Sequence, residues 1–153
     1  MAQVRNRGFF EVAVYHPKKP VNVGTLWRTA YQTGASSIVT IGTRYPQQAA
    51  DTVKSWLHVP HREYLEFEDF YQHLPVGARL IAIEEGGRTL KSFVHPEQAV
   101  YLLGAEDSGI PPEVVKRCHN HVSLTAVRHP SYNLAIAGAI VMYHRLSQFT
   151  NDS

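Results

Sequence analysis

Several features that would assign a chemical class at once are missing from this 153-residue sequence. Cys118 is the only cysteine, so an intramolecular disulfide is impossible and a reducing compartment, the cytoplasm, is expected. The N-terminus has no apolar signal segment, and the longest apolar run, residues 134–143, is far shorter than the roughly 20 residues that a membrane span needs. We therefore expect a soluble cytoplasmic protein without a membrane partner.

The common signatures of nucleotide-binding proteins and hydrolases are also absent. No Gly-x-Gly-x-x-Gly follows the first predicted strand, no Gly-x-x-x-x-Gly-Lys occurs, and no Gly-x-Ser-x-Gly follows a strand. Cys118, His119 and His121 are residue types that bind zinc, but no second cluster completes the four ligands of a structural site. We expect neither ordinary NAD, ATP or serine hydrolase chemistry nor a metal.

Charge is too low to identify a partner. The formal net charge is +2, and no basic tail or low-complexity segment is present, so the composition allows only a weak attraction to polyanions. With 44% hydrophobic residues and no linker, residues 1–153 are expected to form one domain, in which residues 1–8 are a flexible N-terminal extension.

Strands and helices alternate along the sequence. Strands are predicted at residues 9–15, 36–41 and 121–126, with a possible short strand at 62–67. Short apolar runs bounded by glycine predict two buried parallel strands at 79–84 and 100–103. Helical spacing predicts helices from Asn22 to a stop at Gly34, at 47–57, around Phe70, at 112–118, and from Ser131 to about Gln148. This alternation predicts an α/β fold in which helices cover both faces of a parallel sheet.

The predicted last helix is apolar on nearly every side over residues 134–141. A helix of this kind must be covered by more than its own sheet, and a partner subunit is the simplest cover.

Three separated segments carry the chemistry. The first is residues 22–30, NVGTLWRTA. Arg28 lies off the apolar stripe of its helix, where its guanidinium fork could grip a phosphate, although a surface salt bridge would also suit it. Asn22 could simply cap the helix, and Gly24 could admit a ligand or merely be tolerated near the helix start.

The second segment is residues 102–111, LLGAEDSGIP, which follows a buried strand. It could be a plain turn between a strand and a helix. In open α/β sheets, however, ligands bind beyond the carboxyl ends of strands, and Gly104 would let a nucleoside-like ligand approach the main chain. The third segment is residues 131–135, SYNLA, where Ser131 could cap the last helix and leave neighbouring N–H groups for a ligand.

In this order and near these spacings, the three segments resemble the signature motifs of the SpoU/TrmH family of SPOUT-class RNA 2′-O-ribose methyltransferases. The resemblance covers nearly the whole chain and is closest to the minimal, TrmL-like members, which lack an added RNA-binding domain. It implies a deep trefoil knot in the C-terminal third, a homodimer, S-adenosylmethionine as methyl donor, and a ribose 2′-hydroxyl of RNA as acceptor.

The resemblance also implies site residues. The matching positions with catalytic roles are Asn22, Arg28, Glu106, Ser131 and Asn133. Those expected to bind the donor, mainly through backbone groups, are Ile83, Gly104, Leu124, Ser131 and Asn133.

Arg28 is the residue most implicated in catalysis. Because the pKa of arginine exceeds about 12, we expect Arg28 to hold and polarise the phosphate beside the ribose, rather than to act as a general base. The third motif departs from the family pattern, because residues 124–130, LTAVRHP, are one residue shorter than in TrmL-like members. That departure leaves Thr125, Arg128 and His129 as open candidates for contacts.

The function expected is therefore methylation of a ribose 2′-hydroxyl, with tRNA as substrate and the wobble nucleotide as a possible target. Methylation of ribosomal RNA is the alternative within the class. A catalytically silent RNA-binding protein of the same fold and a nucleotide-binding enzyme unrelated to methylation are the alternatives outside it.

Overall fold

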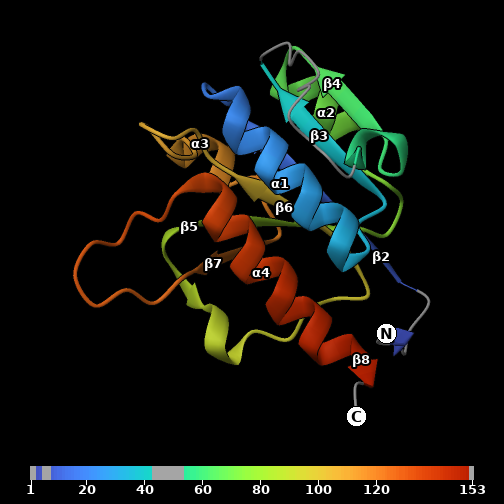
Figure 1. Ribbon diagram of the computed structural model, residues 1–153. Coiled ribbons are helices and arrows are strands. Elements are labelled where there is room, and N and C mark those ends of the chain that lie inside the picture. Colours follow the sequence, from blue (N-terminus) through green and yellow to red (C-terminus); the bar gives the residue numbers. More distant parts are fainter. Residues whose placement is uncertain (1–2, 5–7, 43–53, 152–153) are drawn as a thin grey trace.

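The computed structural model describes residues 3–4, 8–42 and 54–151. Its central feature is a sheet in which all paired strands run parallel (Figure 1). Within the described residues this sheet has six strands, in the spatial order β4 (His61–Tyr64), β3 (Ser37–Ile41), β2 (Phe9–Tyr15), β6 (Gln98–Leu103), β5 (Arg79–Thr89) and β7 (Asn120–Ser123). The predicted α/β class with a parallel sheet is confirmed.

Both faces of the sheet are buried. On β2, Val12 and Val14 point into one hydrophobic core, whereas Ala13 points into a second core on the opposite face. Every residue of β3 is buried as well. Strands with two buried faces carry apolar side chains in both directions, which is why these segments are near-continuous apolar runs in the sequence.

The helices divide between the two faces. Helices α1 (Pro20–Thr33) and α4 (Leu134–Phe149) lie side by side on one face, as Figure 1 shows. Helices α2 (Phe67–Gln72) and α3 (Pro112–Val115) pack against the other face. The two 3₁₀ turns of the described chain are η1 (Ser55–Leu57) and η2 (Leu90–Ser92). None of the helices in the described residues is both long and apolar enough to cross a membrane.

Local sequence explains the limits of α1. Pro20 occupies its first turn, where the missing N–H is not needed, and Gly34 ends it in the left-handed conformation at φ 90°. The predicted stop at Gly34 is confirmed. The predicted start at Asn22 is two residues late, because the helix begins at Pro20 and its N-cap is Lys19.

Other predicted elements differ in extent. The last helix begins at Leu134 rather than at Ser131, and the strand predicted over 121–126 ends at Ser123. Of the helix predicted over 47–57, residues 47–53 lie outside the described residues and Ser55–Leu57 form η1.

Strand β5 is longer than predicted because it continues past an irregularity. Both Ile83 and Arg88 pair with Val122 of β7, and the chain between them includes Gly86 at φ 83°. Few residues other than glycine adopt that conformation. The irregularity creates a bulging segment at the end of the strand.

The two chain ends lie together (Figure 1). Strand β1 (Gln3–Val4) pairs antiparallel with β8 (Thr150–Asn151). A flexible extension was expected over residues 1–8. Gln3 and Val4 of this segment form a strand, and residues 1–2 and 5–7 lie outside the described residues.

A buried polar network fixes the distal half of α4. Arginine can only donate, so the bond from Arg145 Nη1 to the Tyr101 hydroxyl (3.1 Å) leaves the tyrosine hydrogen for His95 Nδ1 (2.6 Å). Neutral His95 then carries its proton on Nε2 and donates to His144 Nδ1 (2.8 Å). Arg145 also donates to the carbonyl oxygens of Pro96 and Glu97, both at 2.7 Å. The network ties α4 to the segment leading into β6.

This network should make stability sensitive to acid. Burial, followed by the nearby His144 and Arg145, lowers the pKa of His95 from 6.5 to about 3. Between these pH values the unfolded chain binds a proton that the folded chain does not, so the free energy of unfolding should fall as the pH decreases from 6.5 towards 3. A His95→Gln variant should show a shallower decline in urea unfolding, and parallel declines would exclude His95 as the cause.

Candidate active site

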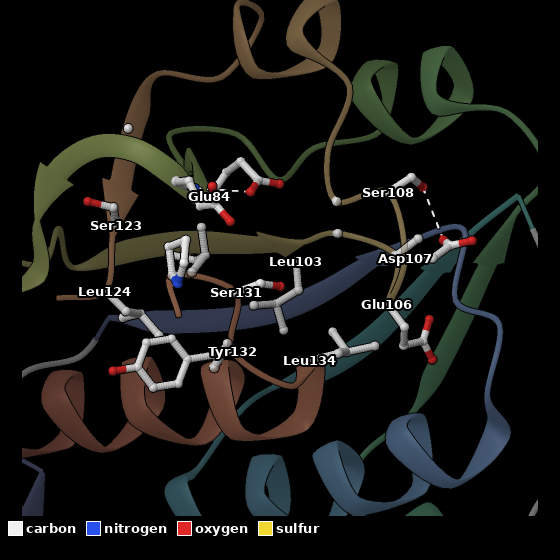
Figure 2. Close-up of a pocket in the computed structure, with 18 of the residues that line it drawn as sticks. Glu84, Leu103, Glu106, Asp107, Ser108, Ser123, Leu124, Ser131, Tyr132 and Leu134 are labelled. Atoms are coloured by element: carbon white, nitrogen blue, oxygen red, sulfur yellow. Dashed lines mark hydrogen bonds between the residues drawn. The ribbon is translucent and has the colours of Figure 1, made fainter. Parts of the chain in front are cut away.

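A pocket opens at the carboxyl ends of β5, β6 and β7, the edge where ligands bind in open α/β sheets. Its volume is about 620 Å³, which is enough for a molecule of nucleoside size. Figure 2 shows side chains from three loops and from the start of α4 around it. The wall comprises residues 83–86, 103–109, 123–124 and 129–132, together with Leu134 and Ala137.

One polar chain joins the three sequence motifs beside this pocket. Asn133, from the third motif, donates from Nδ2 to Oδ1 of Asn22 in the first motif (3.2 Å). Asn22 in turn donates from Nδ2 to Oε2 of Glu106 in the second motif (3.0 Å). Segments more than 80 residues apart are thus connected through side chains. The fold brings these three residues together as one unit.

Glu106 binds the start of α1. Its Oε1 accepts from the backbone N–H of Lys18 (3.0 Å), and its Oε2 accepts from that of Lys19 (2.9 Å) as well as from Asn22. Partial burial opposes ionisation, but the hydrogen bonds from Asn22 and from backbone N–H groups outweigh it, and the pKa of Glu106 is lowered. Glu106 is an anion that anchors the positive end of α1, and it has no proton to donate.

Asn133 has the capping role that the sequence suggested for Ser131. Its Oδ1 accepts from the backbone N–H groups of Ala135 (2.9 Å) and Ile136 (3.2 Å), so Asn133 is the N-cap of α4. The prediction that Ser131 caps this helix is wrong, because Ser131 lies two residues before the cap. Asn22, the other suggested cap, lies inside α1 and uses its side chain for Glu106 and Asn133.

The structure shows a reason for glycine at position 104 that the sequence did not reveal. A Cβ atom at this position would lie 2.3 Å from the carbonyl carbon of Gly109 and 2.5 Å from the nitrogen of Ile110. The loop therefore folds back against Gly104, and the chain fills the space that a side chain would need. Gly104 still lines the pocket.

Glu84 is a site residue that the sequence reasoning missed. It follows Ile83 at the pocket edge of β5, and its Oε2 accepts from the backbone N–H of Ile110 (2.6 Å). Its Oε1 accepts from the N–H of Glu85 (3.0 Å). Glu84 thereby holds the second-motif loop against the end of β5. No local pattern in the sequence could have paired an acid with a backbone group 26 residues away.

The loop of the third motif is held by its own side chains. The hydroxyl of Tyr132 donates to the carbonyl oxygen of Thr125 (2.6 Å), and the hydroxyls of Thr125 and Thr89 lie 3.3 Å apart. The backbone N–H of Ser131 donates to His129 Nδ1 (3.2 Å). Of the three open candidates for contacts, His129 lines the pocket, whereas Thr125 and Arg128 do not.

The predicted site residues divide into those that line the pocket and those that lie outside its wall. Ile83, Gly104, Glu106, Leu124 and Ser131 line it. Asn22 and Asn133 are outside the wall but are bonded to it through Glu106.

Arg28 lies further from the pocket wall than Asn22 and Asn133 do. It lies six residues beyond Asn22 on α1, about 9 Å along the helix axis, with an exposed side chain. Among the described residues the side chain of Arg28 forms no hydrogen bond or ion pair. The fold of a single chain leaves its guanidinium free but outside the pocket wall.

The residue types that suggested zinc have other roles. His119 Nδ1 accepts from the backbone N–H of Leu80 (2.8 Å), and His121 Nε2 donates to the carbonyl oxygen of Glu84 (3.0 Å). In the described part of the chain, no group of three His, Cys, Asp or Glu residues could hold a metal ion.

This geometry can be compared with known proteins. The sequence model of the SpoU rRNA Methylase family matches residues 10–143. The chain belongs to the SpoU methylase family. The family that the three motifs predicted is therefore confirmed, and this SpoU methylase is an RNA methyltransferase. A search of curated protein sequences gives no match.

Solved structures resemble this SpoU methylase over nearly its whole length. One, described for the 2-OH methylation of C/U34 on tRNA, is 26% identical, with a TM-score of 0.82 over 94% of this chain and 97% of its own. An rRNA methyltransferase from Sinorhizobium meliloti with bound AdoMet is also 26% identical, with a TM-score of 0.83 over 95% of this chain and 59% of its own.

A third structure shares the fold. The SpoU methyltransferase AviRb from Streptomyces viridochromogenes, in complex with AdoMet, is 21% identical, with a TM-score of 0.82 over 95% of this chain and 60% of its own. The methyl donor expected from the sequence, S-adenosylmethionine, is thus the cofactor present in two of these three structures.

Proposed function

We propose that this SpoU methylase transfers a methyl group from S-adenosylmethionine to a ribose 2′-hydroxyl of tRNA. The observation that carries the proposal is the hydrogen-bonded chain from Asn133 through Asn22 to Glu106, which joins all three motifs at one pocket. The tRNA substrate rests on the relative described for 2-OH methylation of tRNA, which this chain matches over 94% of its length. The expected location is the cytoplasm.

The pocket suits the proposed donor. S-adenosylmethionine combines an adenosine with a cationic sulfonium and an ammonium group. Apolar side chains of Ile83, Leu103, Leu124 and Leu134 line the wall, where a purine could pack. The carboxylates of Glu84 and Glu85 lie in the same wall, and opposite charge favours a cationic ligand there. Among the described residues the carboxylate of Glu85 has no hydrogen-bond or ion-pair partner, so its charge is available.

The residues of the chain would contribute positioning rather than covalent chemistry. A bound S-adenosylmethionine supplies an activated methyl group, so the protein must align the ribose oxygen with it and allow the hydroxyl proton to leave. Glu106, Asn22 and Asn133 hold the start of α1 against the second-motif loop, and Ser131 lines the pocket. Arg28 holds and polarises the phosphate beside the ribose, and that phosphate accepts the proton.

The proposal includes a homodimer. On α4, Ile136, Ile140 and Tyr143 expose 51%, 37% and 66% of their surface along one face of the helix. On the neighbouring α1, Val21 is 65% exposed and lies seven residues before Arg28, on the same helix face. A second copy packed over these helices would bury the apolar side chains and bring Arg28 to the interface. Sedimentation of the purified protein measures this association.

The deep trefoil knot of the family is likewise a proposal for this chain. Its support is that the loops after β5, β6 and β7 all meet at one pocket. A crystallographic trace of the C-terminal third would reveal whether the chain passes through one of these loops.

A single assay tests the proposed activity. Purified protein is incubated with radiolabelled S-adenosylmethionine and total RNA, and the RNA is digested to nucleosides. Labelled 2′-O-methylribose in tRNA is the expected product. Label only in ribosomal RNA would favour the alternative that the Sinorhizobium meliloti relative represents. A labelled base would refute ribose methylation, and donor binding without any transfer would indicate a catalytically silent protein.

A further inference from the structure

The loop between β7 and α4, residues 124–133, projects from the body of the protein (Figure 1). Residues 124 and 129–132 of this loop line the pocket. The tip of the loop carries Val127, which is 96% exposed, and Arg128, which is also exposed. Next to them, His129 belongs to the pocket wall. The tip therefore stands at the mouth of the pocket, with one apolar and one cationic side chain directed to solvent.

Hydrogen bonds fix the two ends of this loop at its base. The bond from the Tyr132 hydroxyl to the Thr125 carbonyl oxygen, at 2.6 Å, spans seven residues and closes the loop. The contact between Thr125 and Thr89, at 3.3 Å, fixes the closed base to the end of β5. These bonds restrict the base of the loop, so the tip keeps a defined position relative to the pocket.

The negative charge of the pocket wall suggests a role for the exposed Arg128. The pocket wall carries four carboxylates, from Glu84, Glu85, Glu106 and Asp107. A wall of this charge repels RNA phosphates, so phosphates must be held by cations outside it. Among the described residues Arg128 forms no ion pair or hydrogen bond, which leaves its fork free to bind a phosphate in two places.

We propose that residues 124–133 form an RNA-contacting loop in which Arg128 binds a backbone phosphate and Val127 packs against an adjacent nucleotide. This inference rests on the proposed function, because it assigns the RNA to the pocket mouth. It also gives a role to the segment in which this chain departs from the motif pattern of its family.

An Arg128→Gln variant tests the phosphate contact, with Arg79→Gln as its matched control. Arg79 is also exposed and also without an ion pair in the described residues, but it begins β5, at the edge of the sheet opposite the pocket. Binding of fluorescein-labelled unfractionated tRNA is measured over a range of salt concentrations. For Arg128→Gln we expect binding to weaken about tenfold, with the slope of log K against log salt reduced by about one. Arg79→Gln should match the parent.

Two further variants separate the parts of the proposal. Val127→Ser should weaken tRNA binding by about threefold without changing the salt slope, because it removes apolar contact and no charge. Tyr132→Phe keeps the ring but removes the hydrogen bond to Thr125, and should release the tip and weaken tRNA binding. Tyr71→Phe, on α2 at the opposite face of the sheet, is its control.

The outcomes distinguish this inference from the proposed function. If Arg128→Gln and Arg79→Gln bind tRNA equally well while the parent methylates tRNA, the loop is not an RNA contact and the proposed function stands. If the parent binds tRNA through Arg128 but labels no ribose, the proposed function fails and the contact remains. A smaller oligomer for Arg128→Gln in sedimentation would also overturn the inference, since it would assign the tip to a protein interface.

Discussion

Replacing Arg28 with alanine is expected to abolish turnover while leaving the affinity for S-adenosylmethionine nearly unchanged. The Arg28 side chain is exposed, is unpaired among the described residues and lies outside the pocket wall, so the variant should neither unfold the chain nor alter the donor site. Removing one positioned electrostatic group typically slows a reaction by about a hundredfold or more. Single-turnover transfer to RNA and calorimetric titration with S-adenosylhomocysteine measure the two quantities separately.

Two controls sharpen this prediction. Arg79→Ala removes an exposed arginine from the edge of the sheet opposite the pocket, and should leave both quantities at the parent level. Arg28→Lys keeps the charge but loses the bidentate fork, and should retain only part of the rate. An equal loss of donor affinity and turnover in Arg28→Ala would show that the guanidinium serves the donor site rather than the RNA.

The parts of the fold that were predictable from the sequence are those set by local physical chemistry. Residues 9–15 are apolar except for Glu11 because β2 is buried on both faces, and the predicted bounds are those observed. Gly34 stops α1 because the left-handed conformation there suits glycine. These features depend on neighbours along the chain, which a sequence displays directly.

The errors concern residues whose roles depend on distant partners. Ser131 and Asn133 are both good N-cap residues, and only the course of the preceding loop decides which of them begins α4. Gly104 does follow a strand at the pocket, but the neighbour that excludes a side chain is its own loop at Gly109. Glu84 has no recognisable motif because its partner is the backbone N–H of Ile110.

Within the site, too, the sequence could not reveal roles that depend on distant partners. The order and spacing of the three motifs identified the family, yet the sequence could not show that Asn22 donates to Glu106, and Asn133 to Asn22, rather than to a ligand. In the structure these side chains satisfy one another, so the motifs have an architectural role beside any catalytic one. This distinction makes Glu106 the most informative position for testing the site.

A Glu106→Gln variant is expected to lose about 2 kcal/mol of stability and at least about tenfold in kcat/KM for the donor, although the side chain keeps its shape. The carboxylate accepts from three donors, the backbone N–H groups of Lys18 and Lys19 and the amide of Asn22. A glutamine offers one acceptor oxygen, and in either orientation its NH₂ group faces an N–H. The start of α1 should therefore separate from the second-motif loop, which forms part of the pocket wall.

The matched control is Asp107→Asn, the same chemical change at the next residue. Among the described residues the exposed Asp107 side chain pairs only with the exposed Lys18 ammonium and the neighbouring Ser108, so Asp107→Asn should leave the free energy of unfolding close to that of the parent. The dependence of stability on pH provides a second control. Because the pKa of Glu106 is lowered from 4.5, its contribution to stability is complete above pH 4.5 and is lost as the pH falls through the lower folded value. The stability difference between the parent and Glu106→Gln should thus be constant above pH 4.5 and shrink below it. A difference that persists unchanged into strong acid would mean that the anion is not what anchors α1.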